Sequence, residues 1–525
     1  NNELLFFTNY SSNNGQTKSW LHEHDNRYNC YNESLEVAGG VPVNRPNVLV
    51  KKMDQYEITT QAGILHYNMK WLDDDKGKQK KGAFLKSIWL QTCAYLYTNK
   101  IKPTTLEWSC PGSMMEADIN ELDKIYNSLC KLTPIVGAKT TLAYHQNAVT
   151  EAEAVCSYAL SQNFGLNSNN MFLGIDVGGS TSDILLLAKD SDNGNKATLY
   201  RESSVRLAAG VFFNAVIKSD TFRQALLSFH EGHKTNVYVS NIKEILTEPS
   251  KAPYFLNSIF DQLKTTEDYE EFYSSIDVNA KFVFTIPAYV TGMLLYYSGM
   301  LIGKTIKAEH LERISRVDVL SFGKGGRLFH WLLNSAGVRA TREYYADCLN
   351  AGVRMVVGKE LDVVYRDEIA EDNKAEVAKG LCDPKELEKK AFSSESDICG
   401  ESGVKYIMAN GAPKELQAED ELTGDYFANE MNNFDFSGIE NFEKFMNIFL
   451  DFVSVKTHLY PQADNALRSD LADLPNRIAS YICNNDTEYR KARKSEDGSF
   501  HYHQPLIIAE GVCFLDTLIK KVFDQ

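Results

Sequence analysis

The residues whose types and spacing most clearly suggest a binding or catalytic site lie in one short stretch, 171–188. There, two apolar runs flank a polar turn. The turn reads DVGGSTSD and holds two carboxylates, two glycines and three hydroxyl side chains. Gly178 and Gly179 can adopt backbone angles closed to other residues and carry no Cβ, so successive N–H groups can converge on an anion. Ser180, Thr181 and Ser182 add hydrogen-bond donors. The pattern predicts a phosphate-binding turn.

Asp176 and Asp183 frame this turn on its two sides. Asp176 is poorly placed to touch phosphate but well placed to hold a hydrated Mg²⁺ that does. The runs 172–175 and 184–187 are too short for separate helices and too apolar for exposed strands. We therefore expect both as central strands of a sheet covered on both faces. Turn chemistry alone favours the alternative, a glycine hairpin capped by Asp and Ser.

A second stretch, 317–331, combines an apolar strand, a glycine-rich turn and the start of an apolar helix. Gly323, Gly325 and Gly326 carry no Cβ, so other groups can approach the backbone of this turn closely. Arg327 follows the last of these glycines. A generic packing turn is the alternative interpretation of this pattern.

The elements expected to position these turns alternate between helix and strand. Apolar residues recur at intervals of three and four in the helices expected near 83–96, 115–132 and 151–160. Short strands are expected between them, which indicates an α/β fold. The charged run 73–82 is expected as a flexible connector, and a strand is expected at 282–286.

This order of elements, with the turn D-x-G-G-S-T-x-D, resembles the nucleotide-binding domains of Hsp70 proteins in the actin, Hsp70 and sugar-kinase superfamily. The resemblance covers roughly 80–382. It implies an actin-like ATPase fold, in which two related RNase H-like α/β domains with inserted subdomains bind ATP or ADP with Mg²⁺. The implied domains are 1–165, 166–382 with an inserted lobe at about 211–310 that covers the nucleotide, and a mainly helical C-terminal extension, 383–525.

The same resemblance implies roles for individual residues. Asp176 and Asp183 would hold the hydrated metal, and the turn 178–181 would bind phosphate. Gly323, Gly325 and Gly326 would let the backbone approach the sugar and the base closely. Arg327 would lie against the adenine face, where a planar guanidinium stacks well. Glu151 would orient the attacking water, although a helix-start glutamate favoured by the helix dipole is the alternative.

The chain departs from the family pattern at several positions. Ala152 replaces the proline that follows the glutamate, and Lys324 replaces the second glycine of the adenosine motif. Residues 208–210 read Ala-Ala-Gly where Hsp70 proteins carry Gly-Gly-acid. The superfamily's first phosphate loop is not visible and is expected ahead of residue 1.

The amino-acid composition argues against some classes of function. A formal net charge of -15 argues against a nucleic-acid partner, because phosphate backbones demand basic surface. Ten cysteines without a C-x-x-C pair fit reduced thiols, and no apolar run of membrane-spanning length is evident. These features favour a cytoplasmic protein without a membrane span.

Three functions compete at this point. The first is an Hsp70-like, Mg²⁺-dependent ATPase switch that couples domain closure to a protein partner held by the C-terminal region. The second is a filament-forming relative of actin, and the third is a small-molecule kinase. The phenylalanine stripe within 434–452 is expected to be core rather than a partner site.

Overall fold

The computed structural model describes most of the chain, in two compact units. The first unit holds the described residues up to Cys110 and those of 114–150, and the second holds 151–225 and the described residues from Val278 onward. The described residues are 75–102, 104–111, 114, 116–132, 140–142, 149–161, 166–179, 181–190, 196–216, 219–225, 278–366, 376–382, 388–389, 397–407, 411–421, 434–485 and 504–523, with five short strands between 33 and 67.

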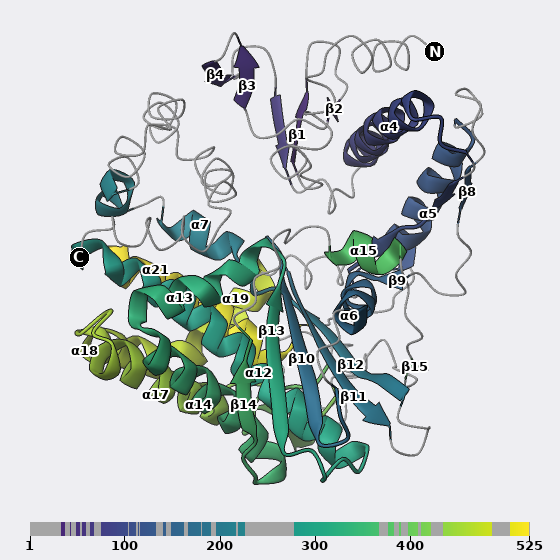
Figure 1. Cartoon of the computed structure of the whole chain (residues 1–525). Coiled ribbons are helices and arrows are strands. Elements are labelled where there is room, and N and C mark those ends of the chain that lie inside the picture. Colours follow the sequence, from purple (N-terminus) through teal and green to yellow (C-terminus); the bar gives the residue numbers. More distant parts are fainter. Residues whose placement is uncertain are drawn as a thin grey trace. The chain divides into compact units, whose positions relative to one another are not determined.

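The second unit is built around a six-stranded sheet with the order β14-β13-β10-β11-β12-β15 (Figure 1). Strands β10, β11 and β12 pair antiparallel, whereas β13 runs parallel to β10 and β14 runs parallel to β13. The predicted mixed α/β class and both hairpin strands are confirmed. The strands are β10 Asn170–Val177, β11 Ser182–Asp190, β12 Lys196–Val205, β13 Arg316–Phe322, β14 Asp362–Tyr365 and β15 Glu388–Lys389.

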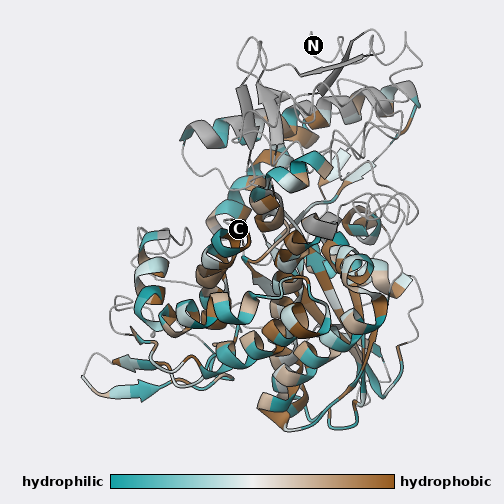
Figure 2. Cartoon of the chain, turned by 90° about the vertical axis from the view of Figure 1, so that its left-hand side faces the viewer, coloured by the Kyte–Doolittle hydropathy of each residue, from teal (hydrophilic) through white to brown (hydrophobic). Residues whose placement is uncertain are grey.

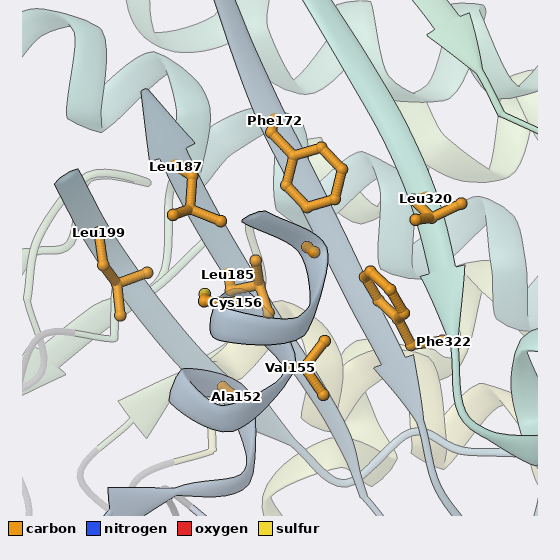
Figure 3. Close-up of a cluster of buried hydrophobic side chains, with 10 residues drawn as sticks. Ala152, Val155, Cys156, Phe172, Leu185, Leu187, Leu199, Leu320 and Phe322 are labelled. Atoms are coloured by element: carbon orange, nitrogen blue, oxygen red, sulfur yellow. The ribbon is translucent and has the colours of Figure 1, made fainter. Parts of the chain in front are cut away.

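Helix α6, Glu151–Ser161, covers one face of this sheet. Figure 3 shows Ala152, Val155 and Cys156 of the helix packed over apolar side chains from four neighbouring strands. A second helix, α15 Glu376–Cys382, lies so close to α6 that a Cβ at Gly380 would overlap the backbone of Ala154. The strand residues of this cluster are Phe172, Leu185, Leu187, Leu199, Leu320 and Phe322.

Helix α12, Thr285–Ala308, is buried along nearly its whole length and packs against α14, Val338–Val357. The expected strand at 282–286 is wrong, because Val278–Phe284 is a 3-10 helix that leads into α12. A helix that is apolar all round has no polar face, so its periodicity gives no signal in the sequence. Residues 280–308 are long and apolar enough to cross a membrane, yet the apolar 18-residue window within them is wholly buried inside the protein.

The C-terminal region is mainly helical, as predicted, and shares its core with α12 and α14. Tyr289 of α12 meets Phe445 and Phe449 edge to face, and Tyr344 of α14 stacks on Phe452 at a ring-centroid distance of 4.0 Å. The phenylalanine stripe is therefore core, as expected. Figure 2 shows hydrophobic and hydrophilic residues on the same helices. The elements are α17 Glu440–Leu450, the π-helix Asp451–Lys456, α18 Ala463–Ala472, α19 Leu474–Asn485 and α21 Leu506–Phe523, with a small antiparallel sheet of β16 Lys405–Ile407, β17 Pro413–Glu415 and β18 Phe434–Asp435.

The first unit has its own small core, in which Phe84 and Trp89 pack with Leu122. Its charged run 73–82 is not the expected connector, because α4 already begins at Asp75. Lysine and glutamine are good helix formers and can lie on a solvated face. The elements are α4 Asp75–Thr98, α5 Glu116–Cys130 and the parallel pairs β6 Thr104–Leu106 with β8 Thr140–Leu142 and β7 Ser109–Cys110 with β9 Val149–Thr150. Further antiparallel strands are β1 Glu33–Glu36, β2 Pro42–Val43, β3 Leu49–Lys52, β4 Gln55–Ile58 and β5 Ile64–Tyr67.

A buried aspartate ties the start of β13 to the neighbouring segments. Asp318 accepts hydrogen bonds from Arg316 at 2.7 Å, from Asn170 at 2.8 Å and from Arg366 at 3.0 Å. Burial raises the pKa of Asp318, but the bonds from Arg316 and Asn170 and the charge of Arg366 outweigh this effect, so the pKa lies below its ordinary value.

We expect Asp318→Asn to lower the free energy of unfolding by about 2 kcal/mol at neutral pH, because bonds to a charged acceptor are lost. The difference should shrink below about pH 4, since a depressed pKa contributes stability only above it. Urea unfolding measures both effects. Glu343→Gln, which breaks the exposed pair with Arg339, is the control and should leave stability nearly unchanged. An equal loss in both variants would contradict a special role for Asp318.

Candidate functional site

Three turns of the second unit meet where β10, β12 and β13 end. These strands run in the same direction, so their carboxyl ends lie at one edge of the sheet. The N–H of Ala209 donates to the carbonyl of Gly178 at 3.1 Å, and the N–H of Gly210 donates to the carbonyl of Gly179 at 3.0 Å. A Cβ at Gly325 would lie 2.6 Å from Val177 Cγ1 and 2.7 Å from Ala209 Cβ. The two turns singled out in the sequence are thus in contact.

The two predicted metal ligands are neighbours. Asp176 and Asp183 are directly opposed in the antiparallel pair of β10 and β11, so their side chains lie on the same face of the sheet. Asp183 is buried and Asp176 is half-buried. The Asp176 carboxylate also lies against Gly323, whose φ of +69° suits glycine and where a Cβ would overlap Asp176 Oδ1.

This donor pair fits Mg²⁺ better than a metal that is enclosed by protein. Within the described part of the chain, no group of three or more His, Cys, Asp or Glu side chains is arranged to hold a metal ion. Mg²⁺ usually keeps several waters and takes one or two carboxylates together with substrate phosphates. Asp176 and Asp183 supply the carboxylates that such an ion requires.

The hairpin turn presents backbone donors beside these aspartates. The N–H of Gly178 donates to the carbonyl of Thr181 at 2.8 Å and closes the turn. Among the described residues, none accepts a hydrogen bond from the N–H of Gly179 or of Thr181. A Cβ at Gly179 would meet nothing within 4 Å, so the turn faces open space there. Ser180 lies outside the described residues.

The glycines of the second turn lie against other parts of the protein, which fits the packing-turn interpretation. The missing side chains of Gly323 and Gly325 make room for Asp176 and Val177, and that of Gly326 makes room for Ser321, which a Cβ would approach to 3.3 Å. The glycines therefore let the turn pack tightly on the hairpin. They do not clear space for a ligand on that side.

Two further predicted residues stand at helix starts. Arg327 is the first residue of α13, Arg327–Ala336, and directly follows the glycine turn. Glu151 is the first residue of α6. This position fits both interpretations of Glu151, the water-orienting one and the plain stabilisation by the helix dipole.

Two residues hold the third turn. Ser182 was expected to be a donor of the phosphate turn, but its hydroxyl bonds to this loop instead, and Gln504 was missed by sequence reasoning. The Ser182 hydroxyl donates to the carbonyl of Leu207 at 2.6 Å, and Gln504 Oε1 accepts the N–H of Arg206 at 3.0 Å. Ser182 was within the hairpin motif, so its hydroxyl could have been assigned to the neighbouring loop. No local sequence pattern indicated the role of Gln504, because its partner Arg206 lies far away in the sequence.

Comparison with known proteins finds no match for this chain, either among family models or among curated protein sequences.

Proposed function

We propose that this chain is a nucleotide-binding protein of the actin, Hsp70 and sugar-kinase superfamily, and that it acts as a Mg²⁺-dependent ATPase switch. One observation carries the proposal. A turn with two available N–H groups, a pair of opposed aspartates and a glycine turn converge at the carboxyl end of parallel strands. Ligands of open α/β sheets bind at that edge.

The strand order supports the actin-like fold that the proposal includes. Three antiparallel strands, β10 to β12, continue into two parallel strands, β13 and β14, on the β10 side. An RNase H-like domain has this order, and the superfamily carries it twice. The parallel pairs β6–β8 and β7–β9 of the first unit are compatible with a second, related α/β domain.

The chemistry proposed for the site depends on positioning and charge, because phosphoryl transfer needs little covalent help from the protein. The N–H groups of Gly179 and Thr181 would donate to phosphate oxygens. Asp176 and Asp183 would hold Mg²⁺ through its waters. When bound, the ion would neutralise charge that develops on the phosphate. Arg327 would stack on the adenine, and Glu151 would orient water.

The wider setting is also part of the proposal. Most of the cysteines that the structure describes are free and buried, which favours a reducing, cytoplasmic compartment. A protein partner would bind through the helical C-terminal region and sense the nucleotide state through the core it shares with α12. The net charge of -15 speaks against a nucleic-acid partner.

The proposal is tested by Asp176→Asn in the 525-residue chain. We expect ATP hydrolysis to fall by about 100-fold, as typically follows loss of one electrostatic element of such a site. The Mg²⁺-dependent gain in ADP affinity should also disappear in calorimetry. The melting temperature of the nucleotide-free protein should not fall, because the substitution removes one of two adjacent negative charges.

Asp190→Asn is the matched control, since Asp190 is a buried aspartate at the other end of β11. Unchanged hydrolysis in Asp176→Asn, or equal losses in both variants, would contradict the proposed site. ATP-dependent pelleting would indicate an actin-like filament instead, and a phosphorylated small-molecule product would indicate a kinase.

A further inference from the structure

The loop that follows β12 is held by a residue from a distant part of the sequence. Gln504 lies just ahead of α21, is 2% exposed, and accepts the N–H of Arg206 through Oε1 at 3.0 Å. The next residue of the loop, Leu207, has its carbonyl bonded by the Ser182 hydroxyl at 2.6 Å. The loop is therefore fixed at its start by both the hairpin and the segment that leads into α21.

The same loop sets the orientation of the hairpin turn. Ala209 and Gly210 donate to the carbonyls of Gly178 and Gly179. In a planar trans peptide the C=O of one residue and the N–H of the next point in opposite directions. Because the Gly178 carbonyl is turned toward the loop, the N–H of Gly179 is turned away from it. The bonds from the loop thus aim a donor of the proposed phosphate site.

Helix α21 is a firm support for this arrangement. The N–H of Ile507 donates to the carbonyl of Cys399 at 3.3 Å, and the Tyr289 hydroxyl donates to the carbonyl of Gly511 at 2.8 Å. Most of its apolar side chains are fully buried. A displacement of the helix N-terminus would pull Arg206 with it, since Gln504 has little freedom to compensate.

We propose that Gln504 is a positioning residue for the nucleotide site, and that α21 and the phosphate turn are mechanically linked through the loop 206–210. This inference rests on the proposed function for its ligand. It deepens that function by naming the element through which the C-terminal region and the site influence each other. The link from α21 to the loop can be measured without nucleotide.

The test compares three variants of the 525-residue chain. Gln504→Met keeps the side-chain volume but removes the acceptor, and Gln504→Glu keeps an acceptor. Thr517→Val is the matched control, because it removes the α21 hydroxyl that accepts a hydrogen bond from Arg477 at 3.1 Å, away from the loop. The readouts are amide hydrogen exchange of Ala209 and Gly210 without nucleotide, and ADP affinity with Mg²⁺.

We expect Gln504→Met to speed exchange of both amides and to weaken ADP binding, each by about 5- to 10-fold, the effect of one lost hydrogen bond. Gln504→Glu should restore most of both, and Thr517→Val should change neither. Unchanged exchange in Gln504→Met, or faster exchange with unchanged affinity, would overturn the inference. A wild-type chain that binds no ADP would refute the proposed function, and exchange alone would then decide whether α21 controls the loop.

Discussion

Gly179→Val is expected to fold like the wild type and to lose nucleotide affinity by at least about 100-fold. Gly179 is exposed, its φ lies outside the left-handed region, and a Cβ there would meet nothing within 4 Å. The new side chain therefore costs the free protein little. It would occupy the space beside the free N–H groups, where the proposed phosphate binds, and a steric block of that size removes several kcal/mol of binding.

Gly325→Val is expected to lower stability, in contrast to Gly179→Val. Its side chain would overlap Val177 and Ala209, so the glycine turn could no longer pack on the hairpin. Such overpacking of a filled site typically costs about 1–3 kcal/mol of stability. Urea unfolding and calorimetry with ADP and Mg²⁺ should thus separate the two variants. Normal ADP binding by Gly179→Val would show that phosphate does not bind at this turn. Wild-type stability of Gly325→Val would show that the glycine turn is not tightly packed.

The second large effect that we expect is a dependence of the free energy of unfolding on pH. It is caused by a pair of buried carboxyl groups. Glu401 and Glu510 are both completely buried. The Glu401 carboxylate accepts the N–H groups of Asn441 and Phe442, at the start of α17, at 2.8 and 2.9 Å. Glu510 of α21 is close enough to Glu401 for the charge of Glu401 to raise its pKa. The other titratable groups that face the pair are Tyr289 and Tyr296 of α12, Cys399 and Cys513.

Burial is the main cause that raises the pKa of both groups. Backbone N–H groups donate to Glu401 and oppose this effect, yet its pKa rises to about 7. The pKa of Glu510 lies well above its ordinary value, because burial and the negative charge of Glu401 both raise it.

The folded protein holds protons here that the unfolded chain releases near the ordinary Glu pKa of 4.5. Stability is consequently complete below that pH and declines as the pH rises through about 7. We expect the shift at Glu401 alone to lower the free energy of unfolding by about 3 kcal/mol between roughly pH 5 and 8, the equivalent of about two pKa units. Urea unfolding across this range measures the slope.

Glu510→Gln removes one of the two buried acids, so it should recover most of the lost stability at alkaline pH. Glu440→Gln changes an exposed glutamate at the start of α17 and should leave the slope as in the wild type. A wild-type stability that is level or rises over this range would show that the pair does not hold these protons in the folded protein.

Local patterns were enough to predict the hairpin, the glycine turn and helix α6. Apolar runs around Gly178 and Gly179 leave few alternatives to paired buried strands, and the same holds for the strand before Gly323. Because β10 and β13 are parallel, the contact between the two turns follows from the topology once the strands are recognised. The paired placement of Asp176 and Asp183 follows from the hairpin register.

The features that the sequence did not predict depend on contacts that form only in the folded chain. Residues 282–286 looked like a strand because an all-buried helix has no amphipathic signal. The role of Gly325 depends on Val177 and Ala209, and that of Gln504 on Arg206, all of them distant in sequence. Glycine in a turn signals close approach, but the sequence does not tell whether protein or ligand fills the space.

Because α12, α17 and α21 share one core, part of that core stays uncovered while the chain is being synthesised. During synthesis the hairpin and the glycine turn leave the ribosome well before Gln504 and the helix α21, whose Phe514 stacks on Tyr289. Until then, the large apolar surface of α12 lacks part of its cover, a state that favours aggregation. The nascent chain thus needs protection from the moment α12 emerges until Leu506–Phe523 has been added.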